Sequence, residues 1–67
     1  MNIRTHDLFQ FFDDGQRAFR LKKLIKDCPK FNLTIYTSAW KAGYYSARDN
    51  FGLKDGFQNF LRNLDNA

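Results

Sequence analysis

Residues 8–19 read LFQFFDDGQRAF, and their large apolar side chains recur at helical spacing. At about 100° per residue, one stripe of such a helix holds Leu8, Phe11, Phe12, Gly15 and Phe19. A glycine inside a helix costs about 1 kcal/mol relative to alanine. Close approach of a second helix is the usual compensation, because glycine has no Cβ to hold two backbones apart. We therefore expect another helix to pack directly on Gly15.

A second interior glycine lies in residues 40–44, WKAGY. Trp40, Gly43 and Tyr44 share one face of the helix that this segment is expected to form. Two glycines inside two helices predict that the helices cross tightly at these positions. Trp40 and Tyr44 would then flank the crossing.

The first helix is predicted over about residues 5–27. Thr5 is a favourable N-cap, and Pro29 stops the helix because the residue before a proline disfavours the helical conformation. The apolar stripe changes sides along this segment. The stripe of the C-terminal half holds Ala18, Leu21, Leu24, Ile25 and Cys28. Either the helix kinks near Gly15, or its two halves contact different partners, for example through a dimer seam along the N-terminal half.

Residues 28–37 are predicted to form an extended linker. Phe31, Leu33 and Ile35 alternate with polar residues, which is also typical of a strand. A lone strand would find no partner within this chain. We therefore favour a linker that places these three side chains in the core.

Two more helices are predicted after the linker. The second covers about residues 38–50 and is capped by Thr37 or Ser38. The third covers about residues 55–64. Its apolar residues follow the amphipathic i, i+3, i+4, i+7 pattern at Phe57, Phe60, Leu61 and Leu64. The sequence thus predicts one all-α domain over residues 1–67, built from three helices.

The length of 67 residues limits the chain to one small core, and such a core is marginal on its own. Cys28 is the only cysteine, so no disulfide can form within the chain. Cys28 and His6 are too few ligands for a structural zinc site. We therefore expect a homodimer, another oligomer or a docked partner to add stability. The lone thiol also suits a reducing, cytoplasmic compartment.

Residue types that support catalysis are scarce. His6 is the only imidazole, and a nucleophile needs a base that is itself held in place. Asp13 and Asp14 are adjacent, so they do not face each other on a helix and are more typical of a solvated face. Cys28 is more typical of a small buried hydrophobe than of a reactive thiol. We expect no catalytic activity, no cofactor and no metal.

Basic side chains are concentrated in one region of a chain whose net charge is +4. Such an excess favours an anionic partner. The densest stretch contains Arg17, Arg20, Lys22, Lys23, Lys26 and Lys30. On a helical wheel these side chains would cover about half of the circumference and leave Leu21, Leu24 and Ile25 free for packing. Phe19 falls among them, either as a ring that stacks on an unpaired base or as part of the core.

Tyr45 and Arg48 would face away from the helix crossing, where they could add stacking and hydrogen bonds to bound RNA. The predicted RNA-binding residues are therefore Arg17, Arg20, Lys22, Lys23, Lys26, Lys30, Tyr45 and Arg48. The predicted structural residues at the crossing are Gly15, Trp40, Gly43 and Tyr44. An ordinary solvated helix face is the alternative interpretation of the basic stretch.

Three short sequence pieces occur in a recognisable order. They are Gly15-x2-Ala18, Cys28-Pro29 and Trp40-x2-Gly43-Tyr44-x2-Ala47. Together they resemble the ribosome modulation factor family over about residues 15–48. That family typically has further glycines where this chain has Phe19 and Lys22, and an aromatic residue where it has Lys30. The resemblance implies a small helical protein that contacts ribosomal RNA and acts on the ribosome.

We therefore expect a small, basic, non-catalytic protein that binds RNA or the ribosome and regulates translation or an RNA-containing complex. The alternative is a phage- or plasmid-encoded accessory protein that inhibits a host enzyme of a defence or toxin system through exposed aromatic side chains, with or without RNA. A membrane partner is disfavoured, because no run approaches the ~18 apolar residues that span a bilayer. Asp13 and Asp14 also place two negative charges on the first helix, which disfavours its binding to an anionic lipid surface.

Overall fold

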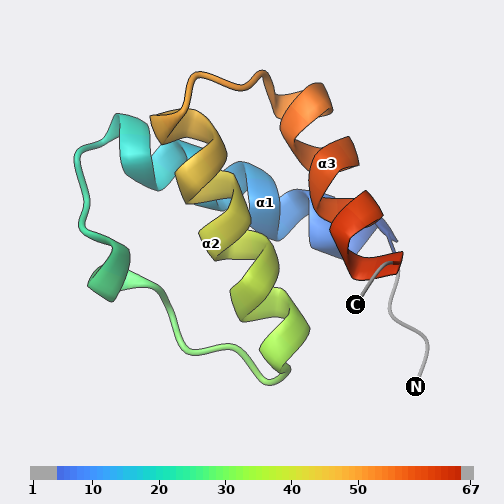
Figure 1. Cartoon of the computed structure of the whole chain (residues 1–67). Coiled ribbons are helices and arrows are strands. Elements are labelled where there is room, and N and C mark those ends of the chain that lie inside the picture. The colour runs from blue at the N-terminus through green and yellow to red at the C-terminus, as the bar shows by residue number, and fades with distance from the viewer. Residues whose placement is uncertain (1–4, 66–67) are drawn as a thin grey trace.

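The computed structural model describes residues 5–65, and its regular elements are helices (Figure 1). Helix α1 spans Thr5–Arg20, α2 spans Thr34–Arg48 and α3 spans Leu53–Asp65. One 3-10 turn, η1 (Ile25–Asp27), lies between α1 and α2. The all-α, three-helix class predicted from the sequence is confirmed, and the described residues form no strand.

The crossing of α1 and α2 organises the fold. The space that a Cβ would need at Gly15 is filled by the backbone carbonyl of Trp40. The space at Gly43 is filled in the same way by the carbonyl of Phe12. Each helix thus presents a glycine to the backbone of the other, and the two backbones touch without intervening side chains. Figure 1 shows α2 passing obliquely across α1.

Aromatic pairs pack on both sides of the crossing. On one side the ring of Phe11 lies 4.8 Å from that of Tyr36, centroid to centroid. On the other side Phe19 lies 5.4 Å from Tyr44 with its plane at 88°. Pairs in these geometries add about 0.5–1.5 kcal/mol beyond the burial of their area. Since residue numbers increase in both helices from the first pair to the second, α1 and α2 run in the same general direction.

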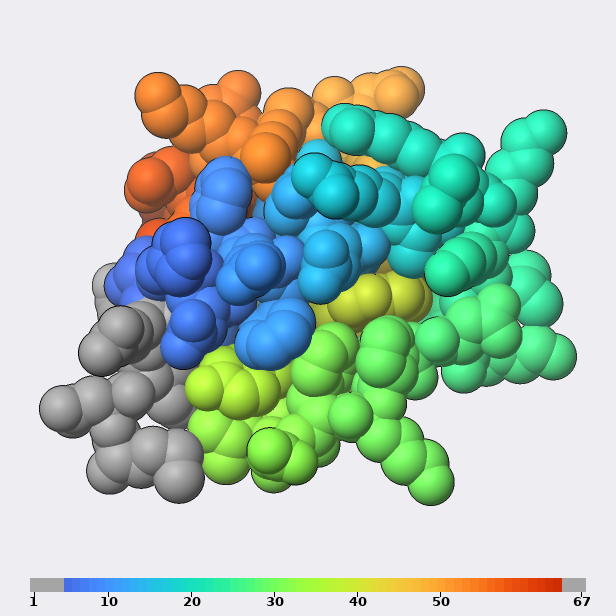
Figure 2. All heavy atoms as spheres, turned by 180° about the vertical axis from the view of Figure 1, so that it is seen from behind, coloured from blue at the N-terminus to red at the C-terminus, as the bar shows by residue number. Residues whose placement is uncertain are grey.

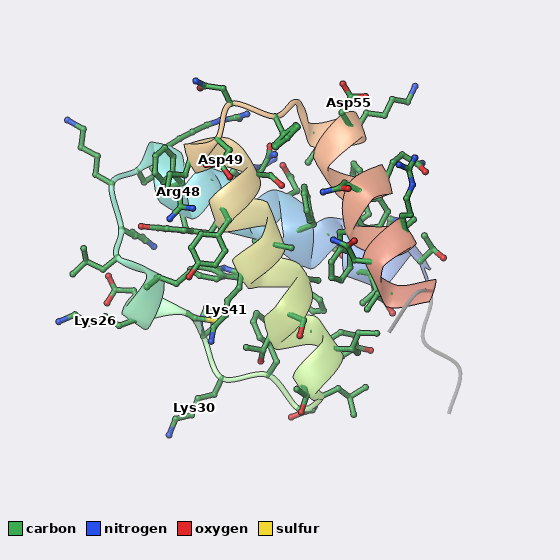
Figure 3. The ribbon with its side chains drawn as sticks, viewed as in Figure 1. Lys26, Lys30, Lys41, Arg48, Asp49 and Asp55 are labelled. Atoms are coloured by element: carbon green, nitrogen blue, oxygen red, sulfur yellow. The ribbon has the colours of Figure 1, made fainter. Side chains whose placement is uncertain are left out.

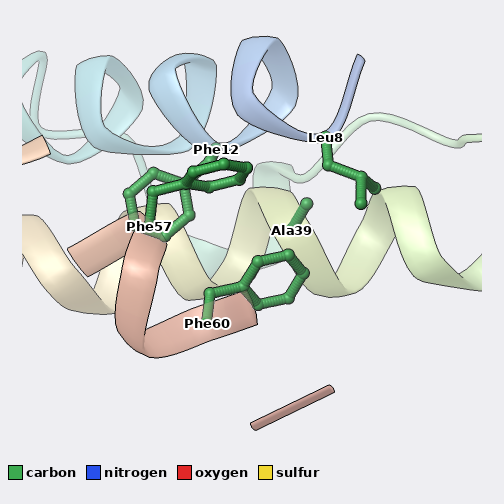
Figure 4. Close-up of a cluster of buried hydrophobic side chains, with 5 residues drawn as sticks. All are labelled: Leu8, Phe12, Ala39, Phe57 and Phe60. Carbon is green, nitrogen blue, oxygen red and sulfur yellow. The ribbon is translucent and has the colours of Figure 1, made fainter. Parts of the chain in front are cut away.

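Helix α3 completes the core by packing on the apolar stripe of α1. The fully buried ring of Phe12 lies 5.5 Å from Phe57 and 6.1 Å from Phe60, between ring centroids. Leu8 and Ala39 complete the buried cluster (Figure 4). The apolar stripe on the N-terminal half of α1, which we considered as a dimer seam, is therefore covered by α2 and α3 of the same chain.

Helix α1 ends at Arg20, well before the end predicted from the sequence. Lys22 has a φ of 62°, in the left-handed region. Its N–H donates to the Phe19 carbonyl, and the Lys23 N–H donates to the Ala18 carbonyl, each at 2.9 Å. This pair of hydrogen bonds is the Schellman motif, which satisfies the last carbonyls of a helix.

Because α1 ends early, the helical-wheel positions predicted for the residues after Arg20 are wrong. The predicted helix over about 5–27 is replaced by a shorter one, and residues 21–24 form a turn and an extended stretch. Leu21 and Leu24 are 69% and 55% exposed, so they do not form the expected packing stripe. Since α1 passes through Gly15 as one continuous helix, the change of stripe marks the end of a helix.

Helix α2 begins at Thr34, inside the stretch 28–37 that was predicted to be extended. Ile35, Tyr36 and Ala39 follow helical spacing and pack in or against the core. Burial of these side chains stabilises the first turn, although Leu33 at the N-cap forms no side-chain cap. Tertiary packing has therefore outweighed the capping signal that favoured a start near residue 38.

The remaining helix ends lie close to their predicted positions. Helix α2 ends at Arg48, and Asn50, with a φ of 64°, follows it in a second Schellman motif. Helix α3 begins at Leu53, slightly before the predicted start. Its Leu61 and Leu64 pack against the core beside the two buried phenylalanines, which confirms the predicted amphipathic pattern.

Gly43→Ala should destabilise the protein, although alanine is the better helix former. The new Cβ would overlap the Phe12 carbonyl, so the two helices would have to separate. We expect a loss of about 1–3 kcal/mol or more, which lowers the melting temperature by at least about 4–8 °C. Thermal unfolding followed by circular dichroism measures this. Gly52→Ala is the control, because its Cβ would meet open space. Equal melting temperatures for the two variants would contradict the tight crossing.

Candidate nucleic-acid interface

Two hollows meet on the surface formed by the end of α1, the segment after it and the C-terminal half of α2. They share three lining residues, Phe19, Leu24 and Tyr44. The first hollow has a volume of about 640 Å³ and extends to Phe51. The second hollow has a volume of about 510 Å³ and extends to Tyr45. Both hollows are open toward solvent.

A set of packed rings fixes the wall that the two hollows share. Tyr44 stacks on Trp40, with the ring centroids 5.6 Å apart and the planes at 19°. Phe19 and Tyr45 meet Tyr44 edge-on, with both interplanar angles at 88°. Trp40 is buried beside the helix crossing, so its ring supports the stacked ring of Tyr44 from the protein interior. The hollows are therefore lined by rings whose positions are set by the fold.

The hydroxyl of Tyr44 ties the segment after α1 to α2. It donates a hydrogen bond of 2.7 Å to the backbone carbonyl of Lys23. Nearby, the carboxylate of Asp27 accepts a hydrogen bond of 3.1 Å from the Leu24 N–H, which closes the η1 turn. These two bonds position the residues that form the outer walls of both hollows.

Five of the predicted RNA-binding cations line the hollows. Arg20, Lys22 and Lys23 line the first, and Lys26 and Arg48 line the second. None of the lining residues, all within the described part of the chain, carries a carboxylate. In Figure 3, Lys26 points outward from the segment, and Arg48 lies on the side of α2 that faces it. The hollows therefore combine aromatic walls with a positive rim.

Arg48 and Tyr45, both predicted from the sequence, contact each other. The guanidinium carbon of Arg48 lies 4.7 Å from the centre of the Tyr45 ring, a cation–π arrangement. The same side chain makes a 3.5 Å ion pair with Asp49. Both partners of that pair are exposed, so it contributes little to stability. One face of the Tyr45 ring is thus already covered by a cation.

Two predicted cations lie outside the hollows. Arg17 makes a 3.1 Å ion pair with Asp13 one turn earlier on α1 and faces a separate depression beside Trp40. Lys30 lies in the linker and points away from the rest of the chain (Figure 3). The segment 21–33 forms one end of the molecule when it is seen from behind (Figure 2). Of the predicted RNA-binding cations, five therefore line the two hollows, whereas Arg17 and Lys30 lie elsewhere on the surface.

Gln16 supports the first hollow from inside the protein. Its side chain is fully buried, yet its amide nitrogen donates to the Phe51 carbonyl at 3.4 Å. Its amide oxygen accepts a hydrogen bond from Arg20, also at 3.4 Å. One side chain of α1 thus connects two residues that line the first hollow. The sequence does carry a signal for Gln16: on a helical wheel this polar residue lies only about 40° from Phe12, within the apolar stripe.

Leu24, Asn50 and Phe51 also line the first hollow but were not predicted as site residues. Leu24 was expected to pack inside a helix. Phe51 is 49% exposed, although a phenylalanine is usually a core residue. Neither position has a local sequence signal, because each depends on where a helix ends. Asn50 follows Asp49, the C-cap of α2, at a position where asparagine is a common helix terminator.

Other chemistry has little support in the described residues. Burial raises the pKa of the Cys28 thiol, and the Lys41 ammonium partly opposes this effect. A higher pKa leaves less thiolate at neutral pH and makes the thiol a weaker nucleophile. Residues 5–65 contain no group of three metal-ligating side chains. None of their helices is both long and apolar enough to cross a membrane.

Comparisons of the chain with protein-family models, with curated proteins and with solved structures found no match.

Tyr44→Phe should loosen the segment after α1 while leaving the core in place. The substitution keeps the ring but removes the hydrogen bond to Lys23. We expect a loss of about 0.5–1.5 kcal/mol in stability and faster amide hydrogen exchange in residues 22–27. Exchange measured by NMR or mass spectrometry tests this. Tyr45→Phe removes the same atom from the neighbouring ring and serves as the control. Unchanged exchange in residues 22–27 of Tyr44→Phe would refute the role of this bond.

Proposed function

We propose that this chain is a small, non-catalytic RNA-binding protein that acts on the ribosome or on another RNA-containing complex. The observation that carries the proposal is the pair of aromatic-walled hollows rimmed by five cations and free of carboxylates. Phosphate contacts by Lys and Arg supply most of the affinity for RNA, and exposed rings add stacking. The lone thiol Cys28 is compatible with action in the cytoplasm.

Lys22, one of the departures from the ribosome modulation factor pattern, also bears on the ligand. The ribosome modulation factor family typically has a glycine at this position. In the present structure Lys22 has a φ of 62°, a conformation that glycine adopts without strain. In this chain Lys22 forms the turn that ends α1 and adds a cation to the rim of the first hollow. This departure from the family pattern favours an anionic ligand.

The alternative is that the surface binds a host protein and inhibits it. The observation that favours this candidate is the exposure of Leu21, Leu24 and Phe51, which are 69%, 55% and 49% exposed. Exposed apolar side chains of this size can serve as anchors in a protein interface. Affinity purification from lysate, with and without ribonuclease, separates the two candidates. A single protein retained after ribonuclease treatment would favour the inhibitor, and loss of all partners would favour RNA.

Lys22→Gly should raise stability and weaken RNA binding at the same time. Relief of the left-handed conformation is worth about 1 kcal/mol, whereas loss of the charge removes one phosphate contact. With five rim cations, the slope of log K against log salt should be about −3.5 for single-stranded RNA and about −2.8 for the variant. Fluorescence anisotropy over a salt series measures the slope, and thermal unfolding measures the stability.

The control for this experiment is Lys54→Ala. It removes the same charge from the exposed first turn of α3, which lines neither hollow. The slope should then stay at the wild-type value. A flat salt response of the wild-type protein, or equal slopes for all three proteins, would contradict the proposal.

A further inference from the structure

We propose that the first hollow is a slot for one unpaired nucleobase, so that the protein selects single-stranded over double-stranded RNA. This inference rests on the proposed function and makes it more specific. The ligand class is a base that is free of a pairing partner, together with the phosphates on either side of it. The elements of the slot are an exposed ring, an amide and three cations around one hollow.

The apolar lining of the first hollow offers surface on which a base can stack. Phe51, which is 49% exposed, lines the hollow together with Phe19 and Tyr44. Leu24, which is 55% exposed, adds an aliphatic edge. A base inserted here would cover apolar surface that otherwise contacts water. Stacking on aromatic side chains is the usual way in which proteins hold an unpaired base.

The polar lining of the first hollow suits the remaining parts of a nucleotide. Arg20, Lys22 and Lys23 stand at the rim, where they can meet the phosphates on either side of the base. Asn50 carries both a hydrogen-bond donor and an acceptor, which is what the edge of a base requires. The buried Gln16 links the Arg20 side chain to the Phe51 backbone, so it connects the end of α1 to the segment after α2 at this hollow.

The second hollow is less suited to the same role. One face of its Tyr45 ring is covered by the Arg48 guanidinium at 4.7 Å. Its rim has two cations, Lys26 and Arg48, against three in the first hollow. It lies directly beside the first hollow, with which it shares Phe19, Leu24 and Tyr44. We therefore assign the base to the first hollow.

Charge also disfavours a symmetric contact between two copies of this chain through the first hollow. Such a contact would bring two rims of three cations together, and like charges at an interface are unfavourable. An uncharged or acidic protein loop could still offer an apolar side chain to Phe51. That occupant is distinguished by the experiment below.

The experiment compares ligands that differ by one base. The probe is a strand of about ten nucleotides made of stable abasic spacers, with or without a single central 2-aminopurine. Both strands carry the same phosphates, so any difference in affinity comes from the base. We expect the base to raise affinity by at least about fivefold and its fluorescence to be quenched by stacking on the protein. Duplex RNA of the same length should bind more weakly than single-stranded RNA.

Variants of the exposed ring provide the second part of the test. Phe51→Ala should abolish the advantage of the base and leave the binding of the fully abasic strand unchanged. Phe51→Tyr keeps a ring and should retain the advantage. Leu21→Ala removes an exposed apolar side chain that does not line this hollow and should have no effect. If Phe51→Ala fails to fold, the comparison of the two strands on the wild-type protein decides alone.

The outcomes separate the slot from the general function. Equal binding of the two strands, with steep salt dependence, would overturn the slot and leave RNA binding by the rim intact. Absence of binding to any RNA would overturn both. Binding of the base to Phe51→Ala as tightly as to the wild type would also overturn the slot, because the ring would then have no part in it.

Discussion

The direct contact between the backbones of α1 and α2 is the constraint on which the rest of the structure depends. At Gly15 and at Gly43, a backbone carbonyl of the opposite helix fills the space that the Cβ of any other residue would need. This contact brings Phe12 under α3, where it meets Phe57 and Phe60. On the other side it brings Phe19 against Tyr44. The core and the hollows therefore lie on opposite sides of the same crossing.

The second determinant is the pair of Schellman motifs that end α1 and α2. At the end of α1, Lys22 turns the chain so that the following basic segment returns to Tyr44. At the end of α2, Asn50 turns the chain toward α3 and leaves Phe51 exposed beside the same hollow. Had α1 continued, Lys22 and Lys23 would lie on a helix face instead of at a rim. The helix ends thus convert a basic stretch of sequence into a shaped surface.

Some of this arrangement could be predicted from the sequence and some could not. Interior glycines have few explanations, so the crossing and the ring of Tyr44 beside it followed from Gly15 and Gly43. The amphipathic pattern of α3 was equally clear. The end of α1 could not be predicted, because lysine at a left-handed position carries no local signal. The exposure of Leu24 and Phe51 follows from that turn and from the α2–α3 connection, so these wall residues were missed as well.

We propose that RNA binds where the end of α1, the segment after it and the end of α2 meet. Titration of ¹⁵N-labelled protein with a short single-stranded RNA at low salt tests this residue by residue. We expect amide chemical shifts to change in residues 19–26 and 44–52 and to stay unchanged in residues 57–64 of α3. Changes concentrated in α3, or none at any RNA concentration, would contradict it.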